Sequence, residues 1–315
     1  MPVNPWISAA RPKTLPLAIS GVLLGGFIAY LNGEFSMGRL GLILVTALFL
    51  QILSNFANDY GDFVKNTDND AGRDDRMLAS GKIAPKTMLF VLVFWSIATL
   101  FLGLLLLKPL FQSGSAYWLF FALGLAAIFS AIKYTVGKFA LAYNSLGDLF
   151  VFVFFGPVAV CGTHFLLTGF VQPRVWLAGV GMGMFCAAVL NVNNMRDFYT
   201  DKQAGKNTLA GKMGLNLSLY YQKFLVLFGY VLVAGAFLCA ENTLVLRSNI
   251  TEALLFVLAS SPWVLLFTGH TSAVAELIKN TDSNRDMWNI QLRNLSLSIL
   301  GFVLFFGLCC WLYVV

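Results

Sequence analysis

The sequence predicts an all-α integral membrane bundle of about nine transmembrane helices. Of its 315 residues, 58% are hydrophobic and 11% are charged, whereas a soluble domain is about 25% charged. The apolar residues form long runs without the period-two alternation of strands. Because backbone groups in lipid must be hydrogen-bonded internally, these runs are expected to be helices. This composition argues against a soluble globular domain, and so apolar and aromatic a chain excludes disorder.

Nine segments approach the roughly 20 apolar residues that a helix needs to cross a bilayer. In chain order they are Leu15–Leu31, Leu40–Phe56, Met88–Leu107, Tyr117–Ile132, Leu146–Leu167, Val175–Val192, Leu217–Cys239, Ala253–Phe267 and Leu295–Tyr313. The first segment lacks a clear small-residue cleavage site, so we interpret it as an uncleaved span. We expect residues 1–315 to form a single transmembrane domain.

The basic residues predict the orientation of these spans. If the N-terminus is cytoplasmic, all but four of the 21 Lys and Arg residues lie on the cytoplasmic side. The exceptions are Arg39, Lys108, Arg174 and Arg247. Because cytoplasmic loops are enriched in Lys and Arg, we expect the N-terminus and the two longest polar loops to be cytoplasmic. The net charge of +6 is explained in this way without a nucleic-acid partner.

The two longest polar loops share an order of residues that predicts an internal duplication. Each begins with Asn-x-x-Asn followed by carboxylates, and continues through an Ala-Gly-basic segment into a small, basic run. These features are Asn55–Asp62, Ala71–Arg73 and Leu78–Lys82 in one loop, and Asn191–Asp201, Ala204–Lys206 and Leu209–Lys212 in the other. We expect repeats of about four helices at about 10–135 and 140–270, followed by a final helix at about 294–315.

Each loop carries amide and carboxylate side chains on one helix face. The two stripes are Asn55, Asp59 and Asp62, and Asn194, Asp197 and Asp201, with spacings of three and four residues. Ionised carboxylates at membrane depth are costly and indicate function. Hard oxygen ligands suit Mg²⁺, which usually keeps waters and is completed by substrate phosphate. The predicted metal ligands are Asn58, Asp59, Asp62, Asp68, Asn194, Asp197 and Asp201.

Basic residues near the two stripes predict that the metal site holds a diphosphate. Guanidinium and ammonium groups pair well with phosphate oxygens. The expected diphosphate contacts are Asn55, Lys65, Arg76, Arg196 and Lys206. For Asp68, a solvated turn with ordinary salt bridges is an equally good interpretation.

In these motifs the chain resembles the UbiA-type intramembrane prenyltransferases. The resemblance rests on Asn58–Asp62 with Asp68, and on Asn194–Asp201. The segments Arg11–Leu15, Ser145–Asp148 and Ala204–Ala210 look like the menaquinone branch of the family. The resemblance covers about residues 5–215, and beyond them it rests on the number of spans. Asp148 departs from the pattern, because much of this branch is expected to have Glu there.

The resemblance implies a UbiA-like bundle with a defined reaction. Two Mg²⁺ ions would link the acidic motifs to a polyprenyl diphosphate, with Asp59, Asp62, Asp197 and Asp201 as the catalytic residues. The polyprenyl group would pass to 1,4-dihydroxy-2-naphthoate with loss of CO2 and diphosphate, giving a demethylmenaquinol for menaquinone biosynthesis. The donor tail would lie between helices or in membrane lipid. A multi-pass enzyme of the bacterial inner membrane with a cytoplasmic site is therefore expected.

The resemblance also suggests roles for five further residues, each with a structural alternative. Tyr134 would line the acceptor site and Lys138 would approach the diphosphate, or the two would be an interfacial aromatic and a topology lysine. Asp148 would orient the naphthoate hydroxyls or satisfy a neighbouring helix. Arg11 and Lys13 would pair with the acceptor carboxylate or anchor the first span.

Alternative functions remain open at this point. Another aromatic acceptor, such as hydroxybenzoate or homogentisate, would keep the same motifs. A transporter is favoured by internal repeats, but the acidic residues cluster at one membrane face. A CDP-alcohol phosphotransferase would have Asp-Gly-x-x-Ala-Arg upstream of its acidic motif, and this sequence has no such segment.

Overall fold

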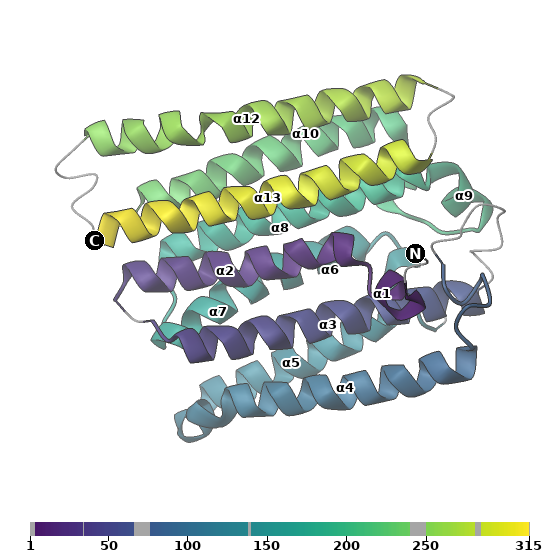
Figure 1. The fold of residues 1–315 in the computed structure, drawn as a ribbon, viewed down its shortest axis with the longest axis horizontal. Helices are drawn as coiled ribbons and strands as arrows, with labels where there is room; N and C mark the ends of the chain where they lie inside the picture. The colour runs from purple at the N-terminus through teal and green to yellow at the C-terminus, as the bar shows by residue number, and fades with distance from the viewer. Residues whose placement is uncertain are drawn as a thin grey trace. The chain divides into compact units, whose positions relative to one another are not determined.

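The computed structural model describes residues 4–33, 35–65, 76–137, 140–239, 250–280 and 285–314, and the elements within them are helices joined by turns and loops, as predicted (Figure 1). Within them, nine helical segments are long and apolar enough to cross a membrane. The prediction of a nine-span helical bundle is therefore confirmed for this part of the chain. The chain divides into two compact units, which are described in turn.

The first unit comprises Met1–Leu15, Gly41–Gly147 and Tyr199–Thr208. Its elements are α1 (Pro5–Ala9), η1 (Pro12–Thr14), most of α3 (Met37–Val64), α4 (Pro85–Leu107), η2 (Lys108–Ser113), α5 (Ser115–Lys133), η3 (Leu141–Tyr143) and most of α9 (Phe198–Gln203). Helices α4 and α5 pack against each other. Trp95 joins α4 to α3, because its ring stacks on Phe49 at 4.8 Å and its Nε1 donates to the Phe49 carbonyl at 3.0 Å.

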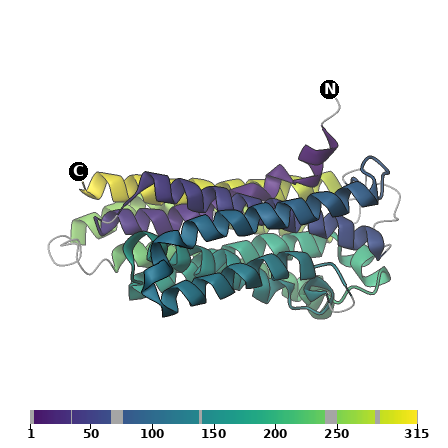
Figure 2. The same ribbon diagram turned by 90° about the horizontal axis from the view of Figure 1, so that it is seen from below.

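The second unit comprises Pro16–Leu40, Asp148–Phe198 and Leu209–Val315. Its elements are α2 (Leu15–Leu31), α6 (Gly147–Val153), the π-helical turn η4 (Phe154–Val158), α7 (Ala159–Thr168), α8 (Pro173–Arg196), α10 (Leu209–Leu238), α12 (Ile250–Lys279) and α13 (Arg285–Val314). Helix α8 packs against α7, α10 and α13, and α12 contacts α10 and α13. These long helices run side by side in both views (Figures 1 and 2).

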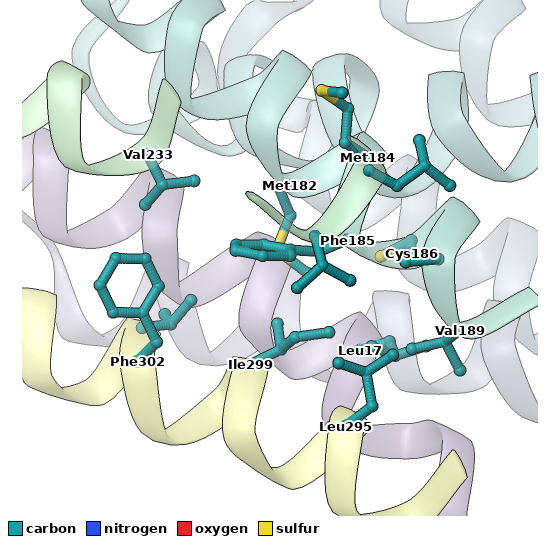
Figure 3. Packing of buried hydrophobic residues seen from close by; sticks show 14 of the residues in the cluster. Leu17, Met182, Met184, Phe185, Cys186, Val189, Val233, Leu295, Ile299 and Phe302 are labelled. Atoms are coloured by element: carbon teal, nitrogen blue, oxygen red, sulfur yellow. The ribbon is translucent and has the colours of Figure 1, made fainter. Parts of the chain in front are cut away.

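Helix α8 lies at the centre of the second unit and is the most buried of the nine spans. Phe185 is fully buried there and meets Phe302 of α13 edge to face, with ring centroids 6.2 Å apart. Met182 and Ile299 lie beside this pair, and Val233 of α10 closes the cluster (Figure 3). This packing fixes the helix whose C-terminal end carries the second acidic motif.

A buried chain of hydrogen bonds joins four helices of the second unit. Asn191 Nδ2 donates to Gln222 Oε1 at 2.9 Å, and Gln222 Nε2 lies 3.3 Å from His270 Nε2. His270 Nδ1 lies 3.1 Å from Gln291 Oε1, which can only accept, so we assign the ring proton to Nδ1. Buried hydrogen bonds of this kind favour one arrangement of helices, although Asn191 Oδ1 has no partner within the described residues. This one ties α8 to α10, α12 and α13 six residues before Asp197.

Glycine on α8 permits a close helix contact that a larger residue would break. A Cβ on Gly183 would lie 2.5 Å from the Phe152 carbonyl oxygen. We expect Gly183→Ala to lower the thermal unfolding midpoint in detergent, at a cost of about 1–3 kcal/mol from overpacking.

Gly235→Ala on α10 is the matched control, because a Cβ there meets no described atom within 4 Å. Alanine is preferred over glycine inside a helix by roughly 0.5–1 kcal/mol, so this variant should be neutral or slightly stabilised. Equal unfolding midpoints for the two variants would contradict the packing described for α8.

Candidate active site

The last two turns of α3 present three polar side chains to the interior of the first unit. Asn55, Asp59 and Asp62 are 5%, 2% and 2% exposed, respectively. Their spacing of four and three residues places them on one helix face, as the sequence predicts. Gly61 permits close packing here, because an added Cβ would lie 2.8 Å from the Thr135 carbonyl carbon. The first predicted stripe is thus formed and buried.

Asp62 is surrounded by hydrogen-bond donors. Arg76 Nη2 lies 3.1 Å from Oδ2, and the Tyr143 hydroxyl donates to Oδ1 at 3.0 Å. With the Asn58 amide oriented to satisfy its neighbours, its nitrogen donates to Asp62 Oδ2 at 2.7 Å and its oxygen accepts from Arg11 Nη1 at 3.0 Å. Charge-assisted bonds of this kind stabilise an ionised carboxylate.

Asp59 has a different environment from Asp62. It faces the Arg11 guanidinium and the backbone at Met77 and Leu78, but neither carboxylate oxygen makes a hydrogen bond within the described residues. Leaving a buried carboxylate without partners is costly. Because Mg²⁺ binds carboxylate oxygens, the chemistry of Asp59 fits that of a metal ligand.

The carboxylates do not form a closed metal cage. In the described part of the chain, no three acidic, imidazole or thiol side chains converge on one point. Mg²⁺ does not need such a cage, because it usually binds through one or two carboxylates and completes its shell with waters and substrate phosphate. The described carboxylates would therefore hold Mg²⁺ only together with waters and substrate phosphate.

Part of the second acidic motif also lies in the first unit. Asp201, in α9, is 5% exposed, and its Oδ1 lies 3.6 Å from Lys206 Nζ. The Lys206 backbone N–H donates to the Asp201 carbonyl at 2.8 Å, which closes the turn after α9. Lys206 Nζ lies 5.4 Å from the centre of the Tyr143 ring, and Lys65 Nζ lies 3.5 Å from it. The two loops thus contribute one lysine each to the same aromatic ring.

The two ammonium groups influence each other. Partial burial lowers the pKa of Lys65 from its ordinary value of 10.5, the charge of Lys206 lowers it further, and Asp62 opposes the shift. Such crowding of like charges is relieved when an anion binds, as expected for a phosphate site.

In the second unit, Asp197 ends α8 and is held by two arginines. Arg196 pairs with both carboxylate oxygens, at 3.0 Å from Nε to Oδ1 and 2.6 Å from Nη2 to Oδ2. Arg285 Nη2 of α13 lies 3.1 Å from Oδ1. Arg196 also donates to Asn193 and to Asn289 of α13, at 2.8 and 2.7 Å. Arg196 was predicted to contact a diphosphate. In this structure its guanidinium pairs with the adjacent residue, Asp197.

Two further predicted residues are buried in the second unit. Asn194 lies one turn before Asp197 and is 5% exposed. Asp148 begins α6, is 6% exposed, and its Oδ1 has no hydrogen-bond partner within the described residues. Tyr221 of α10 lies within electrostatic reach of Asp148. A buried polar atom of this kind can accept a hydrogen bond from a substrate hydroxyl.

The remaining predicted residues have diverse positions. Asn55 Nδ2 donates to the Ala10 carbonyl at 2.7 Å and to Thr14 Oγ1 at 3.1 Å, so Asn55 holds the N-terminal segment to α3. Lys13 is partly buried in η1. Asp68 and Lys138 lie outside the described residues.

Tyr134 directly follows α5, and its hydroxyl packs closely against Gly147. Its carbonyl accepts a hydrogen bond from Ala142 N–H at 2.9 Å, and a Cβ on Gly147 would lie 2.9 Å from its hydroxyl oxygen. Gly147 therefore leaves room for this tyrosine beside the start of α6.

Sequence reasoning missed three residues that contact the acidic motifs: Tyr143, Arg285 and Asn289. Arg285 and Asn289 stand four apart at the start of the last span, the same spacing that revealed the acidic stripes, so a signal was present. Tyr143 lies in a short turn, and no spacing connects it to Asp62.

Comparisons with known proteins agree with these motifs. Residues 18–290 match the profile of the UbiA prenyltransferase family. The chain is 39% identical over 212 residues to 1,4-dihydroxy-2-naphthoate octaprenyltransferase of Haemophilus influenzae, covering 66% of this chain and 69% of that protein. It is 39% identical over 210 residues to the Escherichia coli protein of the same name, covering 66% and 68%.

Solved structures share the fold. A UbiA homologue from Archaeoglobus fulgidus aligns with a TM-score of 0.63 and 15% identity over 97% of this chain and 98% of that one. The structure of a UbiA homologue from the same organism bound to DMAPP and Mg²⁺ aligns with a TM-score of 0.55 and 15% identity over 95% and 98%. At this identity the likeness extends to the fold alone.

We expect Asp62→Asn to lower the rate of prenyl transfer by more than roughly 100-fold. Losing a residue that merely supports a metal ligand typically costs up to about that much, and here a predicted ligand itself loses its charge. Turnover of a prenyl diphosphate and the unfolding midpoint would be measured together. Glu276→Gln, the same change on an exposed residue of α12, is the control and should be silent. Retained activity in Asp62→Asn would refute the assignment.

Arg285→Gln should lower turnover roughly 10- to 100-fold, because Asp197 loses one of its two guanidinium partners. A Mg²⁺ titration of the variant should show a raised half-saturating concentration. Arg293→Gln, an exposed arginine on the same helix, should behave like the wild type. If both variants match the wild type, Arg285 does not support the second motif.

Proposed function

Because the chain belongs to the UbiA prenyltransferase family, we propose that it transfers a polyprenyl group from polyprenyl diphosphate to 1,4-dihydroxy-2-naphthoate. The products would be a demethylmenaquinol, CO2 and diphosphate, and the pathway would be menaquinone biosynthesis. The observation that carries the reaction class is the buried carboxylate pair Asp59 and Asp62 beside Lys65 and Lys206 in the first unit. The acceptor is supported by the relatives at 39% identity, which are named for it.

The donor site would combine metal and basic residues. Asp59 and Asp62, with Asn58, would hold one Mg²⁺ in the first unit, and Asp197 with Asn194 would hold another in the second, with Asp201 and Asp68 as further oxygen ligands. When bound, Mg²⁺ neutralises the charge that develops on the leaving diphosphate. Lys65, Lys206 and Arg76 would bind the phosphate oxygens, and Arg196 and Lys138 would extend this set.

The reaction would proceed by cleavage of the allylic C–O bond of the donor. The bonding electrons leave with the diphosphate, and the electron-deficient carbon is attacked by the acceptor ring at the carbon that bears the carboxylate. A C–C bond forms, CO2 departs, and its bonding electrons restore the aromatic ring. The charges balance without a separate base. The enzyme has therefore to stabilise a departing anion, which preorganised cations do efficiently.

The acceptor ring must lie beside the allylic carbon of the donor, because the new C–C bond forms there. Arg11, which bonds Asn58 and faces Asp59, would pair with the acceptor carboxylate, as would Lys13, its near neighbour in sequence. Asp148 Oδ1, which makes no hydrogen bond within the described residues, would accept a hydrogen bond from a naphthoate hydroxyl, and Tyr134 would be a further acceptor contact.

The membrane setting follows from the donor. A polyprenyl chain is a lipid, and an enzyme with nine apolar spans can keep it between helices or in surrounding lipid. The distribution of Lys and Arg supports a cytoplasmic site in a bacterial inner membrane.

The proposal predicts Mg²⁺-dependent formation of a prenylated, decarboxylated product. The purified protein in lipid would be incubated with Mg²⁺, a polyprenyl diphosphate and 1,4-dihydroxy-2-naphthoate, and the product identified by mass spectrometry. An excess of chelator should stop turnover, because without Mg²⁺ the charge that develops on the leaving diphosphate is not neutralised.

Parallel reactions with hydroxybenzoate and homogentisate test the acceptor. Product from one of these and none from the naphthoate would keep the reaction class and replace the acceptor. Full turnover in excess chelator would refute the metal-dependent donor site.

A further inference from the structure

One tyrosine in the first unit contacts residues from both acidic motifs. Lys65 Nζ lies 3.5 Å and Lys206 Nζ lies 5.4 Å from the centre of the Tyr143 ring. Lys65 follows Asp62 by three residues, and Lys206 follows Asp201 by five. The hydroxyl of the same tyrosine donates to Asp62 Oδ1 at 3.0 Å. Tyr143 therefore combines two separate kinds of contact in one side chain.

An aromatic ring is chemically suited to hold cations that must later bind an anion. The ring face attracts an ammonium through its quadrupole and leaves its charge in place. A carboxylate at the same position would neutralise the lysines and compete with phosphate. Tyr143 can thus bring two mutually repelling cations together without neutralising either, and Lys206 also pairs with Asp201 at 3.6 Å from Nζ to Oδ1.

The turn that carries Tyr143 is fixed in place. Asn144 forms a backbone bridge with Asn207, and Ser145 Oγ donates to the Asn207 carbonyl at 2.6 Å. Ser145 adopts a left-handed conformation with φ of 58°, which is unusual for a residue other than glycine. The turn that carries Tyr143 is therefore bound to the segment that carries Lys206.

We propose that Tyr143 is a positioning residue for the diphosphate site, whose ring gathers Lys65 and Lys206 and whose hydroxyl orients Asp62. The inference rests on the proposed function, since the prenyl diphosphate is the anion that the lysines would bind. The ring contributes to donor affinity, and the hydroxyl contributes to the metal dependence that acts through Asp62.

Two substitutions separate these contributions. Tyr143→Phe keeps the ring and removes the hydroxyl, so the half-saturating Mg²⁺ concentration should rise roughly tenfold while KM for the donor stays unchanged. Tyr143→Leu removes both, so KM for the donor should also rise roughly tenfold, because two cation–π contacts are lost. KM for the naphthoate should not change in either variant.

A measurement without turnover accompanies the kinetics. In chelator, inorganic diphosphate should raise the unfolding midpoint of the wild type and of Tyr143→Phe, and should raise that of Tyr143→Leu much less. Tyr220→Leu is the control, because Tyr220 also has a lysine over its ring, Lys223 at 5.7 Å, but lies on an exposed face of α10. It should match the wild type in every readout.

Lysine variants distinguish failure of this inference from failure of the proposed function. If Lys65→Met with Lys206→Met raises KM for the donor and the Tyr143 variants match the wild type, Tyr143 has no positioning role and the proposed function stands. If the wild type shows no Mg²⁺-dependent transfer, or the lysine variants keep the wild-type KM, the proposed donor site is wrong. Should Tyr143→Leu fail to fold, Tyr143→Phe decides alone: unchanged Mg²⁺ dependence there overturns the proposal.

Discussion

The pairing of buried carboxylates with cations is the interaction on which both units depend. Asp62 has Arg76 in the first unit, and Asp197 has Arg196 and Arg285 in the second. A buried charge without a partner is costly, so these ion pairs stabilise the buried carboxylates. Asp59 differs, because its oxygens make no hydrogen bond within the described residues, and Asp148 Oδ1 shares this property. The structure thus contains both ion-paired acids and acids with oxygens that could accept a ligand.

The sequence predicts the spans and the two acidic stripes well, for physical reasons. A span has to be long and apolar, and a stripe has to repeat every three or four residues, so both leave a local pattern. Tyr143 leaves none, because its contact with Asp62 joins residues 81 positions apart. The contact of Arg196 with Asn289 of α13 likewise joins residues 93 positions apart, so spacing could place Asn289 on a helix face but could not assign it to Arg196. Spacing identifies which side chains share a helix face, and packing decides what they meet.

The two acidic motifs are similar in order but differ in surroundings. In the first, carboxylates lie inside the last turns of α3 and are bonded by an amide, a guanidinium and a phenol. In the second, Asp197 caps α8 and Asp201 belongs to the next short helix, so the two lie in different compact units. The two motifs share an order of residues in the sequence but have different local environments in the structure.

The Asn191–Gln222–His270–Gln291 chain has a consequence for biogenesis. A ribosome delivers α8 and α10 to the membrane before it has made His270, Gln291 or the arginine at 285. In that interval Asn191 and Gln222 have each other as partners, and Asp197 has Arg196. The last two helices then complete both the amide–imidazole chain and the guanidinium pair. The C-terminal third, although poor in motifs, thus completes these contacts. A chain truncated before α12 would keep both acidic motifs but would lack His270, Gln291 and Arg285.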